Sequence, residues 1–308
     1  MDIILGKEHG ITKHSFLCKL KSGTRRVTLM NAADSPYQQG WTEYAPFESK
    51  DGKNWIRVAK GHYNGGTFSF SVSSKAQYAC WFPPYEINQM KKICRLFKKE
   101  GKDVFFLGDE IKPTIVFIAG QHPAETMGLY FLEGILQAAS SSKNFLQNYS
   151  VLVIPYVNKK GVLHKNHRLT PEGVDLNREW ANPKNLLLCS IKKIIATKNI
   201  YAIVDIHGDE VSKKDYVIHN KDFKGSCLEK ICFRQGFLLL KGQSIFKKNI
   251  KSLFQHGKIT FSYGQTAREY FGEKHILSIT LELSAYQNTP KSCMEKGKAF
   301  ILDWMYNS

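Results

Sequence analysis

The sequence lacks the features of disulfide-stabilised secreted domains, cysteine-built zinc modules and membrane-spanning proteins. Its seven cysteines are an odd number, are scattered along the chain and include no Cys-x-x-Cys pair, which argues against both a disulfide framework and a cysteine zinc site. No apolar run approaches the roughly 20 residues that a transmembrane helix needs, and the first residues, MDIILGKEHG, contain only a short apolar run. These absences predict reduced thiols, no secretory signal and a cytoplasmic location.

The chain is also poor in acidic residues, with 27 Asp and Glu against 44 Lys and Arg and a formal net charge of +17. Such a charge suits acidic partners such as nucleic acid, anionic lipid or acidic polypeptide. The lysines are spread along the whole chain, however, and no DNA- or RNA-binding motif is present. We therefore interpret the charge first as a solvated basic surface and second as an attraction for an acidic substrate, and we predict no nucleic-acid or membrane partner.

The 308 residues divide near residue 100 into two regions with different patterns. Residues 1–100 alternate short strand-like pieces with turn signals, as in NWIRVAKGHYNGG and TFSFSVSS, which predicts a small antiparallel β domain. This region closes with EINQMKKICRLFKKEG, whose apolar face predicts an amphipathic linker helix that ends at Gly101. In residues 101–308 strands and helices take turns, which predicts an α/β domain with a mostly parallel or mixed sheet flanked by helices.

Polar side chains follow two of the predicted strands in the second region. His122 and Glu125 come after TIVFIAG, and His207 ends YAIVDI. A catalytic zinc ion commonly takes three nitrogen or oxygen ligands from the protein, and two histidines with one glutamate are a standard set. These three residues therefore form a candidate site for one zinc ion per chain. Asp205 lies on the same strand face as His207 and either orients an imidazole or is a solvated aspartate.

Further candidates lie at other strand ends. Glu282 sits inside the otherwise apolar strand ILSITLELS, where a carboxylate is costly unless it is paired, bound to metal or used to carry protons. It is the candidate general base, and a solvent-facing carboxylate is the alternative. In VDLNREW, Asn177 and Arg178 offer an amide and a guanidinium that could hold a free terminal carboxylate. Taken alone, this stretch also fits an ordinary loop. Arg168 could stabilise an oxyanion, and a surface arginine is the alternative.

In their chain order, the motifs His-x-x-Glu, Arg, Asp-Leu-Asn-Arg, Asp-Ile-His-Gly and Thr-Leu-Glu resemble those of the zinc metallocarboxypeptidases. The context QHPAETMGLYFLEGIL and the small β domain in front are more similar to the cytosolic carboxypeptidase branch, which includes deglutamylases that trim polyglutamate tails. The resemblance covers roughly residues 40 to 305. It implies a carboxypeptidase-like mixed sheet flanked by helices, preceded by a small antiparallel β-sandwich domain. It also implies a zinc carboxypeptidase catalytic domain over residues 101–308, acting on peptide or protein C-terminal tails.

The resemblance assigns roles to individual residues. In chain order these are zinc ligands His122 and Glu125, the carbonyl-binding Arg168, the carboxylate-binding Asn177 and Arg178, the zinc ligand His207 and the general base Glu282. Tyr263 is the candidate for the family's substrate-capping tyrosine, with Tyr270 second. Arg268 falls about where the family places the residue at the base of the pocket for the terminal side chain. An arginine there would favour glutamate or aspartate, while a surface arginine is the alternative.

One departure from the family concerns the residues after the third ligand, where HGDE creates a second His-x-x-Glu from His207 and Glu210. Asp209 and Glu210 would repel an anionic substrate if they faced it, which counts against acidic specificity. The leading hypothesis is a zinc carboxypeptidase that releases a C-terminal acidic residue. An N-acyl amino acid amidohydrolase of aspartoacylase type is an alternative, disfavoured by the preceding β domain. An inactive module that binds acidic tails is another, disfavoured by the intact set of candidate site residues.

Overall fold

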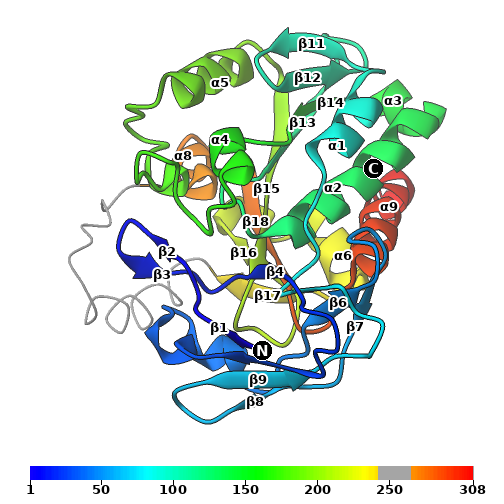
Figure 1. Cartoon of the computed structure of the whole chain (residues 1–308). Helices are drawn as coiled ribbons and strands as arrows, with labels where there is room; N and C mark the ends of the chain where they lie inside the picture. The colour runs from blue at the N-terminus through cyan, green and yellow to red at the C-terminus, as the bar shows by residue number, and fades with distance from the viewer. Residues whose placement is uncertain (242–264, 308) are drawn as a thin grey trace.

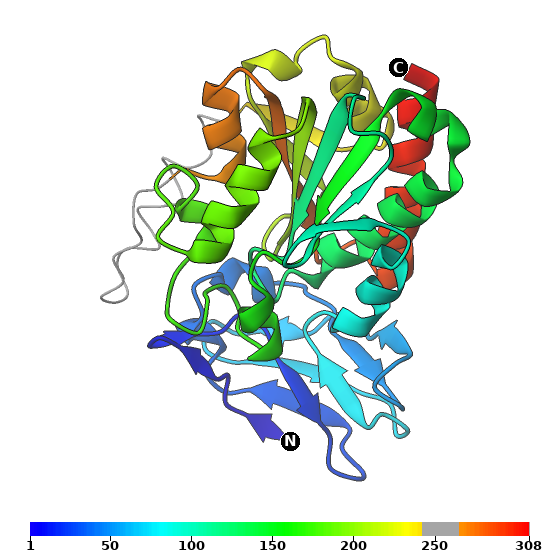
Figure 2. The same ribbon diagram turned by 90° about the horizontal axis from the view of Figure 1, so that it is seen from above.

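The computed structural model describes residues 1–241 and 265–307. An α/β region built on an eight-stranded sheet adjoins a smaller N-terminal β region (Figure 1). Seen from above, the central sheet lies between two groups of helices, and the N-terminal strands lie across one end of it (Figure 2). The predicted α/β fold with a preceding antiparallel β domain is therefore confirmed.

Two four-stranded sheets form most of the N-terminal region, with strand orders β1-β5-β9-β8 and β4-β10-β6-β7. All of their strand pairs are antiparallel except β1 with β5. The strands are β1 (Asp2–Ile3), β4 (Leu17–Lys19), β5 (Arg26–Leu29), β6 (Phe47–Ser49), β7 (Trp55–Arg57), β8 (His62–Tyr63), β9 (Phe68–Ser71) and β10 (Tyr78–Cys80). Aromatic side chains pack between the two sheets. For example, the ring centroid of Phe70 on β9 lies 5.7 Å from that of Phe16, the residue before β4.

Three short elements of the N-terminal region lie outside these two sheets. A hairpin of β2 (Lys7–Glu8) and β3 (Ile11–Thr12) forms a separate two-stranded sheet. Two 3-10 turns, η1 (Ala32–Asp34) and η2 (Gln38–Trp41), connect β5 to β6. The η2 turn packs closely against the α/β region, because a Cβ atom added at Gly40 would lie 2.5 Å from the backbone oxygen of Glu210.

The linker helix is shorter than predicted. Helix α1 (Ile87–Cys94) ends seven residues before Gly101, and β11 (Lys98–Gly101) follows as an edge strand of the large sheet. Phe97 continues the helical spacing of apolar residues, but it is buried in a turn after the helix. The strand forms because β11 pairs with β12 (Val104–Leu107), whose alternate side chains are buried. Such pairing is a non-local contact that helical periodicity does not reveal.

The eight-stranded sheet has the order β11-β12-β14-β13-β15-β18-β16-β17. Its centre is parallel from β14 to β18, and antiparallel pairs of β12 with β14 and of β16 with β18 flank it. The remaining strands are β13 (Thr114–Ala119), β14 (Ser150–Ile154), β15 (Ile200–Asp209), β16 (Tyr216–His219), β17 (Leu238–Lys241) and β18 (Leu277–Ser284). Every residue of β13 and β14 is buried, as expected for parallel strands covered on both faces.

Helices cover both faces of this sheet (Figure 2). On one face lie α2 (Thr126–Ser141), α3 (Lys143–Asn148), α6 (Cys227–Arg234) and α9 (Pro290–Asn307). On the other lie α5 (Leu186–Ala196) and α8 (Ala267–Glu273), while α4 (Lys159–Leu163) lies at the end of the sheet next to the N-terminal region. Two 3-10 turns, η3 (Leu176–Arg178) and η4 (Lys221–Phe223), also lie in the α/β region. Among the described helices, none is long and apolar enough to cross a membrane.

Glycine allows α2 and α9 to approach each other closely. A Cβ atom added at Gly134 of α2 would lie 2.0 Å from the backbone oxygen of Met294, and one at Gly297 of α9 would lie 2.0 Å from that of Phe131. No real Cβ atom tolerates such a distance, so the two helices must pack backbone against backbone at these positions.

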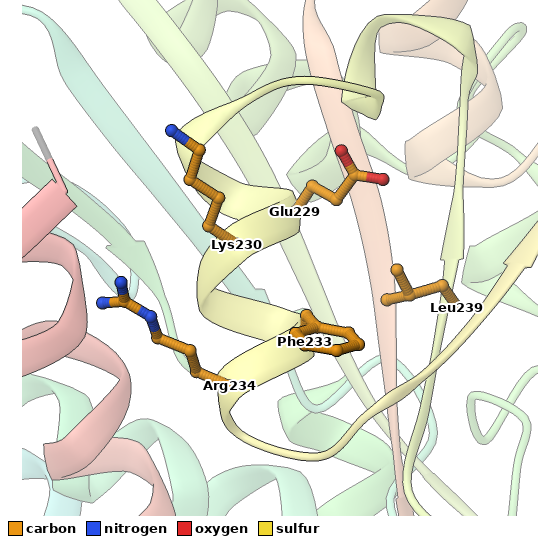
Figure 3. A pocket seen from close by; sticks show the side chains of 5 residues that line it. All are labelled: Glu229, Lys230, Phe233, Arg234 and Leu239. Atoms are coloured by element: carbon orange, nitrogen blue, oxygen red, sulfur yellow. The ribbon is translucent and has the colours of Figure 1, made fainter.

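A surface cavity of about 310 Å³ lies at α6 and β17 (Figure 3). Its lining residues are Glu229, Lys230, Phe233, Arg234 and Leu239. Phe233 is 74% exposed, and none of the five belongs to the polar strand ends predicted to form the site. This cavity is therefore distinct from the candidate active site.

Candidate active site

The predicted metal ligands lie at the carboxyl ends of two neighbouring parallel strands. His122 and Glu125 follow β13, and His207 lies near the end of β15, which pairs with β13. The chain turns sharply after β13 because Gly120 has a positive φ of 63°, and a Cβ there would lie 2.8 Å from the backbone oxygen of Pro155. Glu125 is then the N-cap residue of α2. This is the sheet edge at which open α/β proteins place their ligands.

The three side chains converge on one point. Glu125 Oε1 lies 2.6 Å from His122 Nδ1, and Glu125 Oε2 lies 2.8 Å from His207 Nδ1. The two Nδ1 atoms are 3.2 Å apart, and one potential ligand atom from each residue lies within 4.8 Å of the others. Burial raises the pKa of Glu125, but the two imidazoles outweigh it and hold that pKa below its usual value. A buried carboxylate and two imidazole nitrogens are a donor set that suits zinc.

The outward nitrogen of each imidazole faces a carboxylate. His122 Nε2 lies 3.3 Å from Asp175 Oδ1, and His207 Nε2 lies 3.2 Å from Asp205 Oδ2. Asp205 is fully buried, and Gln121 donates a hydrogen bond of 2.7 Å to its other oxygen. Such pairing fixes the tautomer and orientation of a metal-binding histidine. Asp205 is thus a buried partner of His207 and not a solvated aspartate.

Asp175 is a residue to which the sequence had assigned no role. Besides facing His122, it accepts a hydrogen bond of 2.9 Å from Arg168 Nε and one of 3.0 Å from the Asn177 backbone. Burial raises the pKa of Asp175. The opposite effects of Arg168 and then of His122 are together larger, so the pKa of Asp175 lies well below its usual value. The sequence did contain one indication of a role for Asp175. It is the first residue of the motif Asp-Leu-Asn-Arg, whose last two residues were candidates for the site.

Asn177 and Arg178 lie in η3 beside the metal-ligand cluster. Asn177 Nδ2 is 3.2 Å from His207 Nε2, and its Oδ1 accepts a hydrogen bond from the backbone of Ala267. Arg178 is partly buried and donates from Nη1 to the Asn177 backbone oxygen at 2.8 Å. Arg168 donates weakly from Nη1 to the Tyr37 hydroxyl at 3.4 Å, so a residue of the β region also borders this site. No motif in the sequence pointed to Tyr37.

Glu282 lies on β18 directly opposite His207 in the strand register. Its side chain is partly buried, and burial raises its pKa well above the usual value. His207 opposes this shift, while the carboxylates of Glu125, Asp209 and Glu210 add to it. A carboxyl group with a raised pKa is suited to exchanging protons near neutral pH.

The second His-x-x-Glu pair does not extend the cluster of possible metal ligands among the described residues. Glu210 lies instead 3.4 Å from His167 Nε2, and burial raises its pKa well above the usual value, which favours the neutral acid. Asp209 accepts hydrogen bonds from the Val211 backbone at 2.6 Å and from the Tyr216 hydroxyl at 2.6 Å. Both acids therefore already have local partners.

Two further predicted residues, Arg268 and Tyr270, lie on α8. Arg268 is 5% exposed, pairs through Nη2 with Glu269 at 3.1 Å and has no partner for its Nε among the described residues. Tyr270 is partly buried, with its ring 4.0 Å from Lys192 Nζ and 5.0 Å from Lys274 Nζ. Tyr263 lies outside the described residues.

Two sequence-family profiles match the chain. The profile of the cytosolic carboxypeptidase N-terminal domain matches residues 16–83, and that of zinc carboxypeptidase matches residues 86–202. Together they span more than half of the chain. The second match includes His122 and Glu125 and ends before His207.

Individual relatives match parts of the chain. A Zymomonas mobilis protein described as uncharacterized is 26% identical over 214 residues, which cover 62% of this chain and 56% of that protein. Cytosolic carboxypeptidase 1 of Gallus gallus is 37% identical over 76 residues, which cover 23% of this chain and 6% of that protein. The chain thus spans about half the length of the first relative and a small part of the second.

The fold is shared with solved structures. A metallo-carboxypeptidase from Burkholderia cenocepacia superposes with a TM-score of 0.79 at 20% identity, covering 95% of this chain and 88% of that chain. Its fold agrees with both profile matches and with the order of the motifs. The chain therefore belongs to the zinc metallocarboxypeptidase family and carries the N-terminal domain of its cytosolic carboxypeptidase branch.

Proposed function

We propose that the protein is a zinc-dependent carboxypeptidase that hydrolyses the C-terminal peptide bond of peptide or protein tails and releases glutamate or another acidic residue. The convergence of His122, Glu125 and His207 on one point carries this proposal. Two further features support it. Asn177, which together with Arg178 is the candidate clamp for the terminal carboxylate, lies beside His207, and the candidate general base Glu282 pairs with His207 in the strand register. The names of the relatives support a cytoplasmic setting.

The chemistry divides among these residues. Zinc held by His122, Glu125 and His207 would act as a Lewis acid that polarises the scissile carbonyl and acidifies water. Glu282 takes a proton from the attacking water as the new C–O bond forms, and it donates this proton to the amine as the C–N bond breaks. Its partial burial and its pairing with His207 in the strand register support this role.

Three other residues bind the substrate. Arg168 stabilises the negative charge that develops on the carbonyl oxygen, and Asp175 holds its guanidinium from behind at 2.9 Å. Asn177 and Arg178 bind the free C-terminal carboxylate, the guanidinium in bidentate fashion and the amide as a neutral donor. The requirement for that free carboxylate makes the enzyme release one terminal residue at a time.

Arg268 supplies the preference for acidic side chains. It is buried, and its Nε has no partner in the part of the chain that the structure describes. A glutamate or aspartate side chain would satisfy this donor, whereas an apolar side chain would leave it unpaired in a closed pocket. Asp209 and Glu210 each have a local partner, Tyr216 and His167 respectively, so they should repel an anionic substrate less than free carboxylates would.

A matched pair of peptides tests this function. Two peptides of identical sequence, one with a free C-terminal glutamate and one with that terminus amidated, are incubated with zinc-loaded protein, and the products are identified by mass. We expect loss of a single glutamate from the free peptide and no cleavage of the amidated one. Equal cleavage of both would refute the carboxylate clamp. Hydrolysis of N-acyl amino acids alone would indicate an amidohydrolase, and binding without cleavage would indicate an acidic-tail-binding module.

A further inference from the structure

The carboxylate of Glu8, on strand β2 of the N-terminal hairpin, meets three consecutive backbone amides of the loop that carries Arg168. Oε2 accepts hydrogen bonds from the amide of His167 at 2.5 Å and from that of Arg168 at 3.1 Å. Oε1 accepts a hydrogen bond from the amide of Leu169. Glu8 is only 7% exposed. Successive backbone N–H groups that point the same way form an anion-binding concavity, and here the anion is a side chain from a separate strand pair.

This contact connects the hairpin to the proposed active site in two directions. The Arg168 side chain is fixed at its other end by Asp175, which also faces the outward nitrogen of His122. The backbone oxygen of His167 accepts a hydrogen bond of 3.0 Å from the amide of Ala124. In the sequence, Ala124 lies between the metal-ligand candidates His122 and Glu125, in the turn that follows β13. The loop that Glu8 holds is thus bonded directly to the turn that presents two of the three ligands.

Two residues that follow the hairpin also contact this loop. Lys13 Nζ donates a hydrogen bond of 2.8 Å to the backbone oxygen of Lys165. Ser15 Oγ lies 3.3 Å from His167 Nδ1. These contacts are made by residues that precede the matched N-terminal domain, which begins at residue 16. Glu8 differs from Lys13 and Ser15 in that it binds the backbone amides of residues 167–169, which include Arg168 itself.

We infer that Glu8 is a positioning residue for Arg168, holding its backbone so that the guanidinium meets the carbonyl oxygen of the substrate. The inference rests on the function proposed above for Arg168. Glu8 itself bonds to backbone amides and to none of the proposed metal ligands, so its effect passes through the loop. Its removal should lower turnover more than it weakens substrate binding, because the oxyanion develops only in the transition state.

The test uses Glu8→Ala and Glu8→Gln in the full chain, with Glu172→Ala as the matched control. Glu172 is an exposed acid that lies three residues after Leu169 and pairs with Lys160 at the surface. Zinc content is measured first, then hydrogen exchange of the amides of residues 167–169, then kcat and KM on a cleavable peptide. The exchange measurement reports the contact whether or not the protein cleaves peptides.

For Glu8→Ala we expect zinc binding to be retained, exchange of the three amides to accelerate about tenfold or more and kcat to fall about tenfold with little change in KM. Glu8→Gln keeps one acceptor oxygen and should lie between Glu8→Ala and the native protein, which also covers the case that the alanine variant fails to fold. Glu172→Ala should match the native protein in all three readouts.

A double variant separates positioning from a merely structural role. In an Arg168→Ala background, Glu8→Ala should cause little further loss of kcat/KM, because two residues that act through one group are not additive. Fully additive losses would overturn the inference, and so would unchanged exchange of the three amides in Glu8→Ala. If the native protein cleaved no peptide, the proposed function would fail, while the exchange data would still decide whether Glu8 holds the loop.

Discussion

Replacement of Arg268 by alanine should remove the preference for acidic C-terminal residues. Arg268 is 5% exposed, and Glu269 is the one hydrogen-bonding partner of its guanidinium among the described side chains. The Glu269 side chain is itself 37% exposed, so the loss of this pair leaves no deeply buried unpaired carboxylate. The variant should therefore fold, and its effect should appear in specificity.

The size of the effect follows from the bond that is lost. A hydrogen bond to a charged group contributes about 1.5 to 3 kcal/mol when its alternative is an unsatisfied buried donor. Since about 1.4 kcal/mol corresponds to a factor of ten, kcat/KM for a glutamate-terminated peptide should fall roughly 10- to 100-fold. A neutral terminal residue does not make this bond, so its kcat/KM should change by less than about threefold.

The assay compares two peptides that differ only in a C-terminal glutamate or glutamine, which have nearly the same shape. Arg234→Ala is the matched control, since it removes the same charge from the surface cavity on α6 (Figure 3). This control should leave both rates unchanged, which separates a local pocket from a general effect of net charge. Equal losses on both peptides in Arg268→Ala, or a native preference for glutamine, would refute the pocket assignment.

Other parts of the account predict distinct outcomes. Glu282→Gln should retain zinc and lower kcat by roughly 100-fold or more, because proton transfer to and from a positioned carboxylate is lost; kcat is measured on the glutamate peptide. His207→Ala should lose the metal, measured as zinc per chain, because only two ligands remain. Gly134→Ala should lower the melting temperature by several degrees, since its Cβ would lie 2.0 Å from the Met294 backbone oxygen and overpacking costs about 1 to 3 kcal/mol. Gly6→Ala, where a Cβ meets nothing within 4 Å, is its control.

Each of these outcomes can fail separately. Near-normal turnover of zinc-loaded Glu282→Gln would exclude Glu282 as the general base. A fully loaded His207→Ala variant would point to Glu210 or another ligand. Equal melting temperatures for Gly134→Ala and the native protein would mean that the two helices can separate without cost.

Much of the site was predictable because it depends on local patterns. The apolar run of β13 and the position of His207 in β15 could be recognised separately, and parallel strands bring their carboxyl ends to one edge. Glu282 was conspicuous as a carboxylate within an apolar strand, and the strand register places it opposite His207. These residues needed only strand periodicity and the cost of burying charge.

Other features depend on contacts between distant segments, which a single sequence does not encode in its spacing. Glu8 bonds to a loop about 160 residues away, and Tyr37 reaches Arg168 from the N-terminal region. The early end of α1 follows from the pairing of β11 with β12. Local periodicity favoured a longer helix, but the sheet offered this segment a strand partner.

The most direct test of the central claim is the release of amino acids from peptides that differ only in their C-terminal residue. The panel is incubated with protein containing one zinc per chain and with a chelator-treated sample, and the products are measured by mass spectrometry. The account predicts metal-dependent release of a single terminal residue, fastest for glutamate or aspartate. No release from any peptide by fully zinc-loaded protein would contradict it.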